Sequence, residues 1–80
     1  MSSFLGAKPL HTLLVEILES NKGSLIDSQL FKQLKKLSGG LDDRLFNKVL
    51  MRLELEGLIH VFTLTKNRRR IELVLPKRGQ

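Results

Sequence analysis

Basic side chains near the C-terminus are the residues with the clearest chemical use in this sequence. The stretch from Lys66 to Arg78 contains one acid, Glu72, and six basic residues, which are Lys66, Arg68, Arg69, Arg70, Lys77 and Arg78. It therefore carries +5 of the chain's formal net charge of +6. A localised basic patch indicates a polyanionic partner, usually nucleic acid. The alternative is a solvated hairpin tip that keeps the protein soluble and blunts a sheet edge.

Enzymatic and metal chemistry are not indicated. Serine, histidine and aspartate residues fall mostly where capping, turns or packing explain them, and no spacing suggests a nucleophile with its base. Gly39 and Gly40 follow no strand and have no P-loop lysine. His11 and His60 lack carboxylate or cysteine neighbours at ligand spacing, so we expect no metal and no other cofactor. We also expect no small-molecule effector, because so small a core can spare no cavity.

Length and composition indicate one small globular domain. We expect it over residues 9–75 of the 80-residue chain, between flexible termini at 1–8 and 76–80. A hydrophobic content of 41% argues against disorder. The chain has no cysteine, no apolar run near the roughly 18 residues of a membrane span and no signal-peptide pattern. We therefore expect a cytoplasmic protein without a membrane partner.

The longest predicted element is a helix from about Asp43 to Glu56. Its apolar stripe repeats at helical spacing and consists of Leu45, Phe46, Val49, Leu50 and Leu53. Asp42 is the expected N-cap, and Leu41 with Phe46 has the spacing of a hydrophobic staple. Gly57 is expected to end the helix in a left-handed conformation.

A β-hairpin is predicted after this helix. Its strands are Leu58 to Leu64 and Arg69 to Leu75, joined by Lys66, Asn67 and Arg68 as a three-residue loop with Asn67 left-handed. The favoured register sets Ile59, Val61 and Thr63 opposite Leu75, Leu73 and Ile71. His60, Phe62, Leu64 and Val74 then share the second face. A slip of one residue, anchored by Leu58 and Phe62, would exchange the two faces.

Two shorter helices precede the long one. The first is predicted from Pro9 to Glu19 and the second begins with Asp27 or Ser28 as its cap. Between them Ser24 to Ile26 is expected to add a third strand. The side chains expected in the core are Leu14, Ile17, Leu30, Leu34, Phe46, Leu50, Leu53 and Leu73.

Three segments carry a resemblance to a known family. They are GSLIDSQLFKQL (Gly23 to Leu34), LMRLELEGLI (Leu50 to Ile59) and NRRRIELVL (Asn67 to Leu75). With the predicted element order, they make residues 9–75 resemble the winged helix-turn-helix family, in particular the small regulators of archaea and bacteria. The resemblance implies an α+β fold, with a three-helix core and a wing of two or three antiparallel strands.

For function, the resemblance implies a double-stranded DNA partner and a role in transcription regulation or in a DNA-associated complex. The helix at Asp43–Glu56 would enter the major groove, where Arg44 could read guanine and Asn47 adenine. Lys48 and Arg52 would lie on the same helix. The residues that would hold the DNA backbone are Lys32, Lys35, Lys36, Lys66, Arg68, Arg69 and Arg70. Asp42 and Asp43 oppose this role, because they add negative charge where phosphates approach.

A protein-interaction role is the alternative. Winged helices also serve as interaction modules in multi-subunit assemblies. Phe62, Leu64 and Val74 would form an exposed apolar patch that marks a protein partner or a weak homodimer, and Phe4 and Leu5 could extend it. The other hairpin register, or cover from the N-terminal segment, would remove this patch.

Overall fold

A computed structural model describes residues 8–74 of the chain. It is an α+β domain of three helices and a three-stranded antiparallel sheet. The elements are α1 (Leu10–Ser20), β1 (Ser24–Ile26), α2 (Asp27–Ser38), α3 (Asp43–Leu55), β2 (Ile59–Thr65) and β3 (Arg68–Leu73). The predicted order of elements is confirmed, and α1 and α3 end within one residue of the predicted positions.

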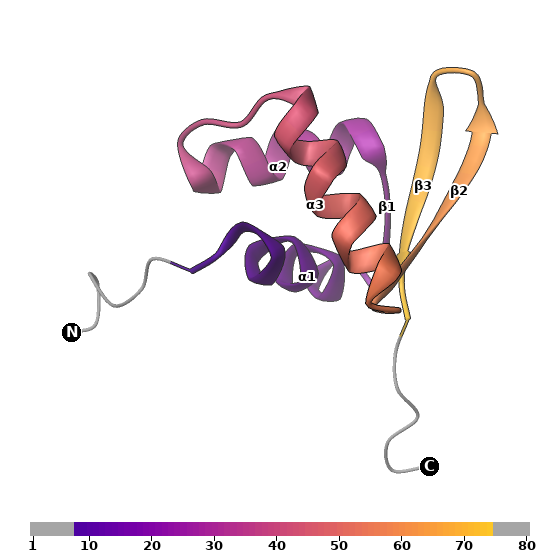
Figure 1. The fold of residues 1–80 in the computed structure, drawn as a ribbon, viewed down its shortest axis with the longest axis horizontal. Coiled ribbons are helices and arrows are strands. Elements are labelled where there is room, and N and C mark those ends of the chain that lie inside the picture. The colour runs from indigo at the N-terminus through magenta and orange to yellow at the C-terminus, as the bar shows by residue number, and fades with distance from the viewer. Residues whose placement is uncertain (1–7, 75–80) are drawn as a thin grey trace, which may run out of the picture.

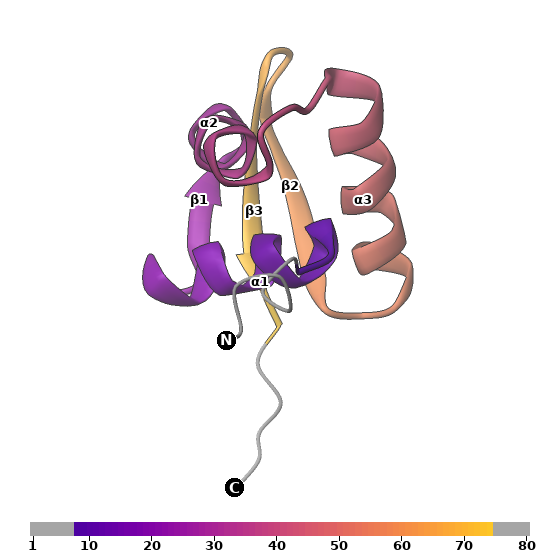
Figure 2. The same cartoon turned by 90° about the vertical axis from the view of Figure 1, so that its left-hand side faces the viewer.

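The helices lie on one face of the sheet. Its strand order is β1-β3-β2, so β1 and β2 are the edges. Figures 1 and 2 show α1, α2 and α3 on the same side of the strands, with the tip of the β2–β3 hairpin extending past them. No helix or strand of residues 8–74 covers the opposite face, which we call the outer sheet face.

The core fills the space between the helices and the sheet. Seven of the eight expected core side chains are buried, and Leu73 is half-buried at its margin. The remaining buried apolar side chains are Leu18, Leu41, Ile59 and Ile71. Because all three helices and the strands β2 and β3 contribute, the helix bundle and the sheet share one core.

The start of α3 follows the capping rules. The Oδ1 atom of Asp42 accepts a hydrogen bond from the backbone N–H of Leu45 at 2.8 Å. Leu41 and Phe46 are both buried, as a hydrophobic staple requires. At the other end Gly57 has φ +76°, so the expected left-handed residue after the helix is confirmed.

The hairpin register is shifted by two residues from the predicted one. Ile59 pairs with Leu73 and Val61 with Ile71. A shift of two keeps the side chains before the bulge in β2 on their predicted faces, since side chains alternate along a strand. Ile59, Val61, Ile71 and Leu73 face the helices as predicted, and the prediction of their strand partners is wrong.

The hairpin connection explains the shift. An irregularity between Thr63 and Thr65 adds one residue to β2, and Arg68 already belongs to β3. The predicted three-residue loop is therefore a two-residue turn, Lys66 and Asn67. Asn67 is not left-handed, because Lys22 is the only non-glycine residue with positive φ among residues 8–74. At the base the Val74 N–H donates to the Leu58 carbonyl at 2.8 Å and fixes the register there.

Two other boundaries differ from the predictions. Ile26 is the N-cap of α2, and its apolar side chain cannot form a capping hydrogen bond. The Asp27 carboxylate binds Arg69 instead of capping the helix. Pro9 is the N-cap of α1 rather than its first helical residue. Lys8, expected in a loose terminus, forms an ion pair with Glu16 at 2.9 Å. The rest of the predicted flexible termini, and Leu75, lie outside the described residues.

Candidate functional site

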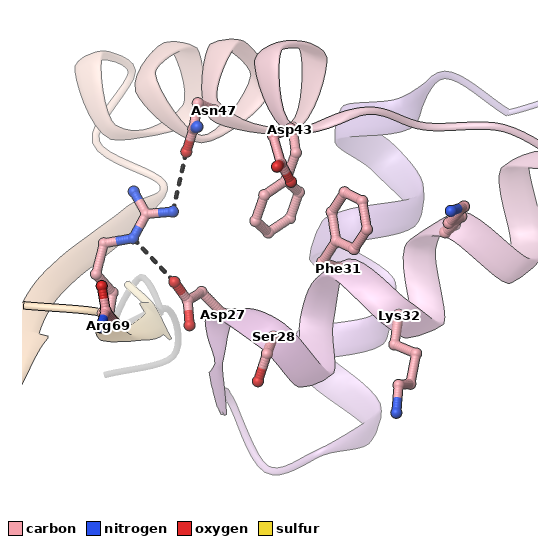
Figure 3. Close-up of a pocket in the computed structure, with 10 residues that line it drawn as sticks. Asp27, Ser28, Phe31, Lys32, Asp43, Asn47 and Arg69 are labelled. Carbon is pink, nitrogen blue, oxygen red and sulfur yellow. Dashed lines mark hydrogen bonds and ion pairs between the residues drawn. The ribbon is translucent and has the colours of Figure 1, made fainter.

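A pocket forms where α2, the start of α3 and the hairpin tip meet (Figure 3). Its volume is about 660 Å³, and it is open to solvent. The lining combines charged, amide and aromatic side chains, namely Asp27, Ser28, Phe31, Lys32, Lys35, Asp43, Phe46, Asn47, Asn67 and Arg69. Residues from three separate elements therefore face one hollow, and we call this surface the three-element face.

Two phenylalanines form the apolar floor of this pocket. The rings of Phe31 and Phe46 pack edge to face, with centroids 5.2 Å apart. The Nζ atom of Lys35 lies 5.7 Å from the centroid of Phe31. Phe31 belongs to α2 and Phe46 to α3, so this contact holds the two helices together beneath the polar rim.

Arg69 joins all three elements of the pocket. From β3 its Nε donates to the Asp27 carboxylate of α2 at 3.0 Å, and its Nη2 donates to Asn47 Oδ1 of α3 at 2.9 Å (Figure 3). The β1–β3 register explains the first contact. Since Ile26, the last residue of β1, pairs with Arg70, the residue that follows it, Asp27, falls beside Arg69.

The residues predicted to contact DNA therefore have different partners in the structure. Arg69 and Asn47, predicted to contact DNA independently, bind each other. Arg52 pairs with Glu56 at 3.3 Å, and Arg70 pairs with Glu72 at 3.1 Å. The Arg70 guanidinium also lies over the Phe62 ring, 5.7 Å from its centroid. Arg70 is consequently on the outer sheet face, away from the pocket.

The remaining predicted cations are exposed. No carboxylate of residues 8–74 lies within ion-pair distance of their side chains. They come from α2, α3 and the hairpin tip, and they are Lys32, Lys35, Lys36, Arg44, Lys48, Lys66 and Arg68. Lys32 and Lys35 line the pocket itself, while Lys66 and Arg68 flank Asn67 at its hairpin side.

The solvent side of α3 changes character along its length. At about 100° per residue, Arg44, Lys48, Met51 and Leu55 point away from the core. Met51 and Leu55 are 61% and 81% exposed. The N-terminal half is thus basic and the C-terminal half apolar. The sequence analysis did not identify Leu55 as an exposed apolar residue. Its position four residues after Met51, outside the core stripe, was the signal that could have shown it.

The outer sheet face holds the predicted partner patch only in part. Phe62 and Leu64 are 41% and 45% exposed, whereas Val74 is half-buried. The ring of His60 lies beside Phe62 with centroids 5.9 Å apart. The Arg70–Glu72 pair lies on the same face, so the patch is broken by polar groups. Phe4 and Leu5, expected to extend it, lie outside the described residues.

Asp27 is the functional candidate that sequence reasoning overlooked. We expected Asp27 or Ser28 to cap α2, but Asp27 serves as the carboxylate partner of Arg69. The register of β1 against β3 brings Asp27 beside Arg69, and the sequence alone did not predict that register.

Residues 8–74 contain no group of three or more His, Cys, Asp or Glu side chains placed to hold a metal ion. Within the same range, no helix combines the length and apolar character that crossing a bilayer requires.

Comparisons of the chain with protein-family models, curated proteins and solved structures gave no match. The arguments for function therefore come from the geometry and charge of the site.

Proposed function

We propose that this protein is a winged-helix domain that binds duplex DNA through its three-element face. In this proposal α2 and α3 form the helix-turn-helix, and the β2–β3 hairpin is the wing. Such a domain fits a transcription regulator or a component of a DNA-associated complex. The N-terminal half of α3 would approach the major groove, and the hairpin tip would follow the adjacent backbone.

The observation that carries the proposal is the presence of exposed cations on all three elements that form the pocket. Lys32 and Lys35 on α2, Arg44 and Lys48 on α3, and Arg68 at the hairpin tip have no carboxylate partner among residues 8–74. Unpaired cations on several elements match a repeating line of phosphates better than a single small anion. Of these cations, Lys32 and Lys35 line the pocket, and Arg68 directly follows its lining residue Asn67.

The acidic residues at this face reduce its net attraction for DNA. Arg69 neutralises Asp27, and the Asp42 carboxylate caps α3. Asp43 lines the pocket and opposes an approaching phosphate. We therefore expect most of the affinity to come from backbone contacts, with a smaller contribution from base contacts of α3.

Fluorescence anisotropy with a random-sequence duplex, measured over a series of salt concentrations, tests the proposal. About five neutralised phosphates predict a slope of about −5 in log affinity against log salt. Arg68→Glu should weaken binding to all sequences alike. It should also make this slope shallower by about 1 or more.

Lys22→Glu is the matched control, because it changes the net charge by the same amount. Lys22 precedes β1, at the end of the sheet opposite the hairpin tip, since Ser24 pairs with Glu72. Equal losses in the two variants would indicate a general charge effect, and no binding by the wild type at low salt would refute the proposal.

A protein-interaction module is the second candidate. The supporting observation is a set of exposed apolar side chains, Met51 and Leu55 on α3 and Leu58, Phe62 and Leu64 in and before β2. Exposed apolar side chains that gather on a surface mark protein partners or contacts between copies. This candidate predicts that Phe62→Ser abolishes a partner contact and leaves duplex binding intact.

A further inference from the structure

We infer that Arg69 acts as a positioning residue that makes Asn47 a hydrogen-bond donor, so that Asn47 selects guanine rather than adenine. This inference rests on the proposed DNA binding and specifies its base preference. It replaces two sequence-based expectations, a backbone contact for Arg69 and adenine reading for Asn47.

The chemistry of the guanidinium group sets the orientation of the Asn47 amide. Arginine side chains donate hydrogen bonds and cannot accept them. The group that faces Arg69 Nη2 at 2.9 Å must therefore be the carbonyl oxygen of Asn47. The amide nitrogen, with its two hydrogens, is then the end that remains for a ligand. In Figure 3 the amide oxygen points down to Arg69 from the α3 ribbon.

Arg69 itself is held on its other side. Its Nε binds the Asp27 carboxylate at 3.0 Å, and the Asp27 side chain is only 17% exposed. The backbone of β3 is fixed beside β1 by the pairing of Arg70 with Ile26. With its backbone paired in the sheet and its Nε bound to the carboxylate, Arg69 keeps its Nη2 directed at Asn47 of α3. Charge-assisted contacts of this kind are stronger than those between neutral groups.

The fixed orientation of the Asn47 amide changes which DNA base it can recognise. Adenine offers an acceptor at N7 and a donor at N6, so its recognition by asparagine uses both the oxygen and the nitrogen of the amide. The Asn47 oxygen already accepts from Arg69, so the adenine amino group would have to share this oxygen with a fixed positive charge. Guanine offers two acceptors, N7 and O6, which suit the amide hydrogens of Asn47. The fixed positive charge of Arg69 beside them also favours acceptors over the adenine amino group.

Selection of binding sequences from a randomised duplex library tests this inference. For the wild type we expect guanine at the position whose preference disappears in Asn47→Ala. In Arg69→Met the amide is free to rotate, so preference at that position should move towards adenine. One good base contact discriminates by about five- to a hundredfold, which sets the size of the expected change.

Arg68→Met is the matched control, since it removes a neighbouring arginine that has no partner among residues 8–74. It should lower affinity for all sequences and leave the base preference unchanged. A purely structural role for Arg69 would likewise alter affinity without exchanging one base for another.

The outcomes separate the inference from the proposed function. Adenine at the Asn47-dependent position of the wild type, or no position that depends on Asn47, overturns the inference while duplex binding stands. Unchanged base preference in a folded Arg69→Met also overturns it. If that variant does not fold, the comparison of wild type with Asn47→Ala still decides between guanine and adenine. No duplex binding by the wild type overturns the proposed function and the inference together.

Discussion

Arg69 shows how the same residue type takes different roles within a few positions. Arg68, Arg69 and Arg70 are consecutive, yet one is exposed at the hairpin tip, one links α2 to α3, and one stacks on Phe62. Strand alternation sends Arg69 and Arg70 to opposite faces. The sequence predicted a common electrostatic role because charge can be read from residue type, whereas the partners Asp27 and Asn47 depend on tertiary contacts.

The core residues of α3 are more predictable, because helical periodicity is a local property. Leu53 is fully buried and Leu55 is 81% exposed, although only one residue separates them. Leu53→Ala should lower the free energy of unfolding by about 2–5 kcal/mol through lost burial and the resulting cavity. Leu55→Ala should change it by no more than about 0.5 kcal/mol. Urea unfolding of both variants measures this difference, and equal losses would show that α3 is rotated from its described orientation.

Among the elements, the helices were predicted more accurately than the hairpin. Capping by Asp42 and the glycine after α3 are encoded within a few residues, and both predictions are confirmed. The hairpin partners were wrong because one extra residue in β2, between Thr63 and Thr65, changes the connection. Such a bulge leaves the alternation of side chains before it intact. The sequence therefore predicted which side chains of the hairpin face the helices, but not which residues of β2 and β3 pair.

The turn between α2 and α3 allows a test at the level of elements. Gly39 ends α2 with φ +79°, whereas Gly40 is not left-handed, and a Cβ atom at either position meets nothing within 4 Å. Gly39→Ala should therefore cost about 1–2 kcal/mol through backbone strain alone. Gly40→Ala should be neutral, or stabilising by up to about 1 kcal/mol through the unfolded state. Thermal unfolding compares the two, and an equal effect would contradict the left-handed end of α2.

For the whole molecule, the sequence predicted the α+β class and the excess of positive charge, but not how that charge is divided. Part of it is used internally, because Arg69, Arg70 and Arg52 have carboxylate partners. Within residues 8–74, unpaired cations remain on α2, α3 and the hairpin tip, and the outer sheet face carries exposed apolar groups. The hairpin tip and the outer sheet face can therefore be changed separately, which makes the two candidate functions separable by experiment.

The most direct test of the central claim is an NMR titration of the ¹⁵N-labelled protein with a short random-sequence duplex at low salt. We predict that the largest amide shifts occur at Lys32, Arg44 and Arg68, with little change at Leu58 and Phe62. Shifts concentrated on the outer sheet face, or no shifts at any amide, would contradict DNA binding through the three-element face.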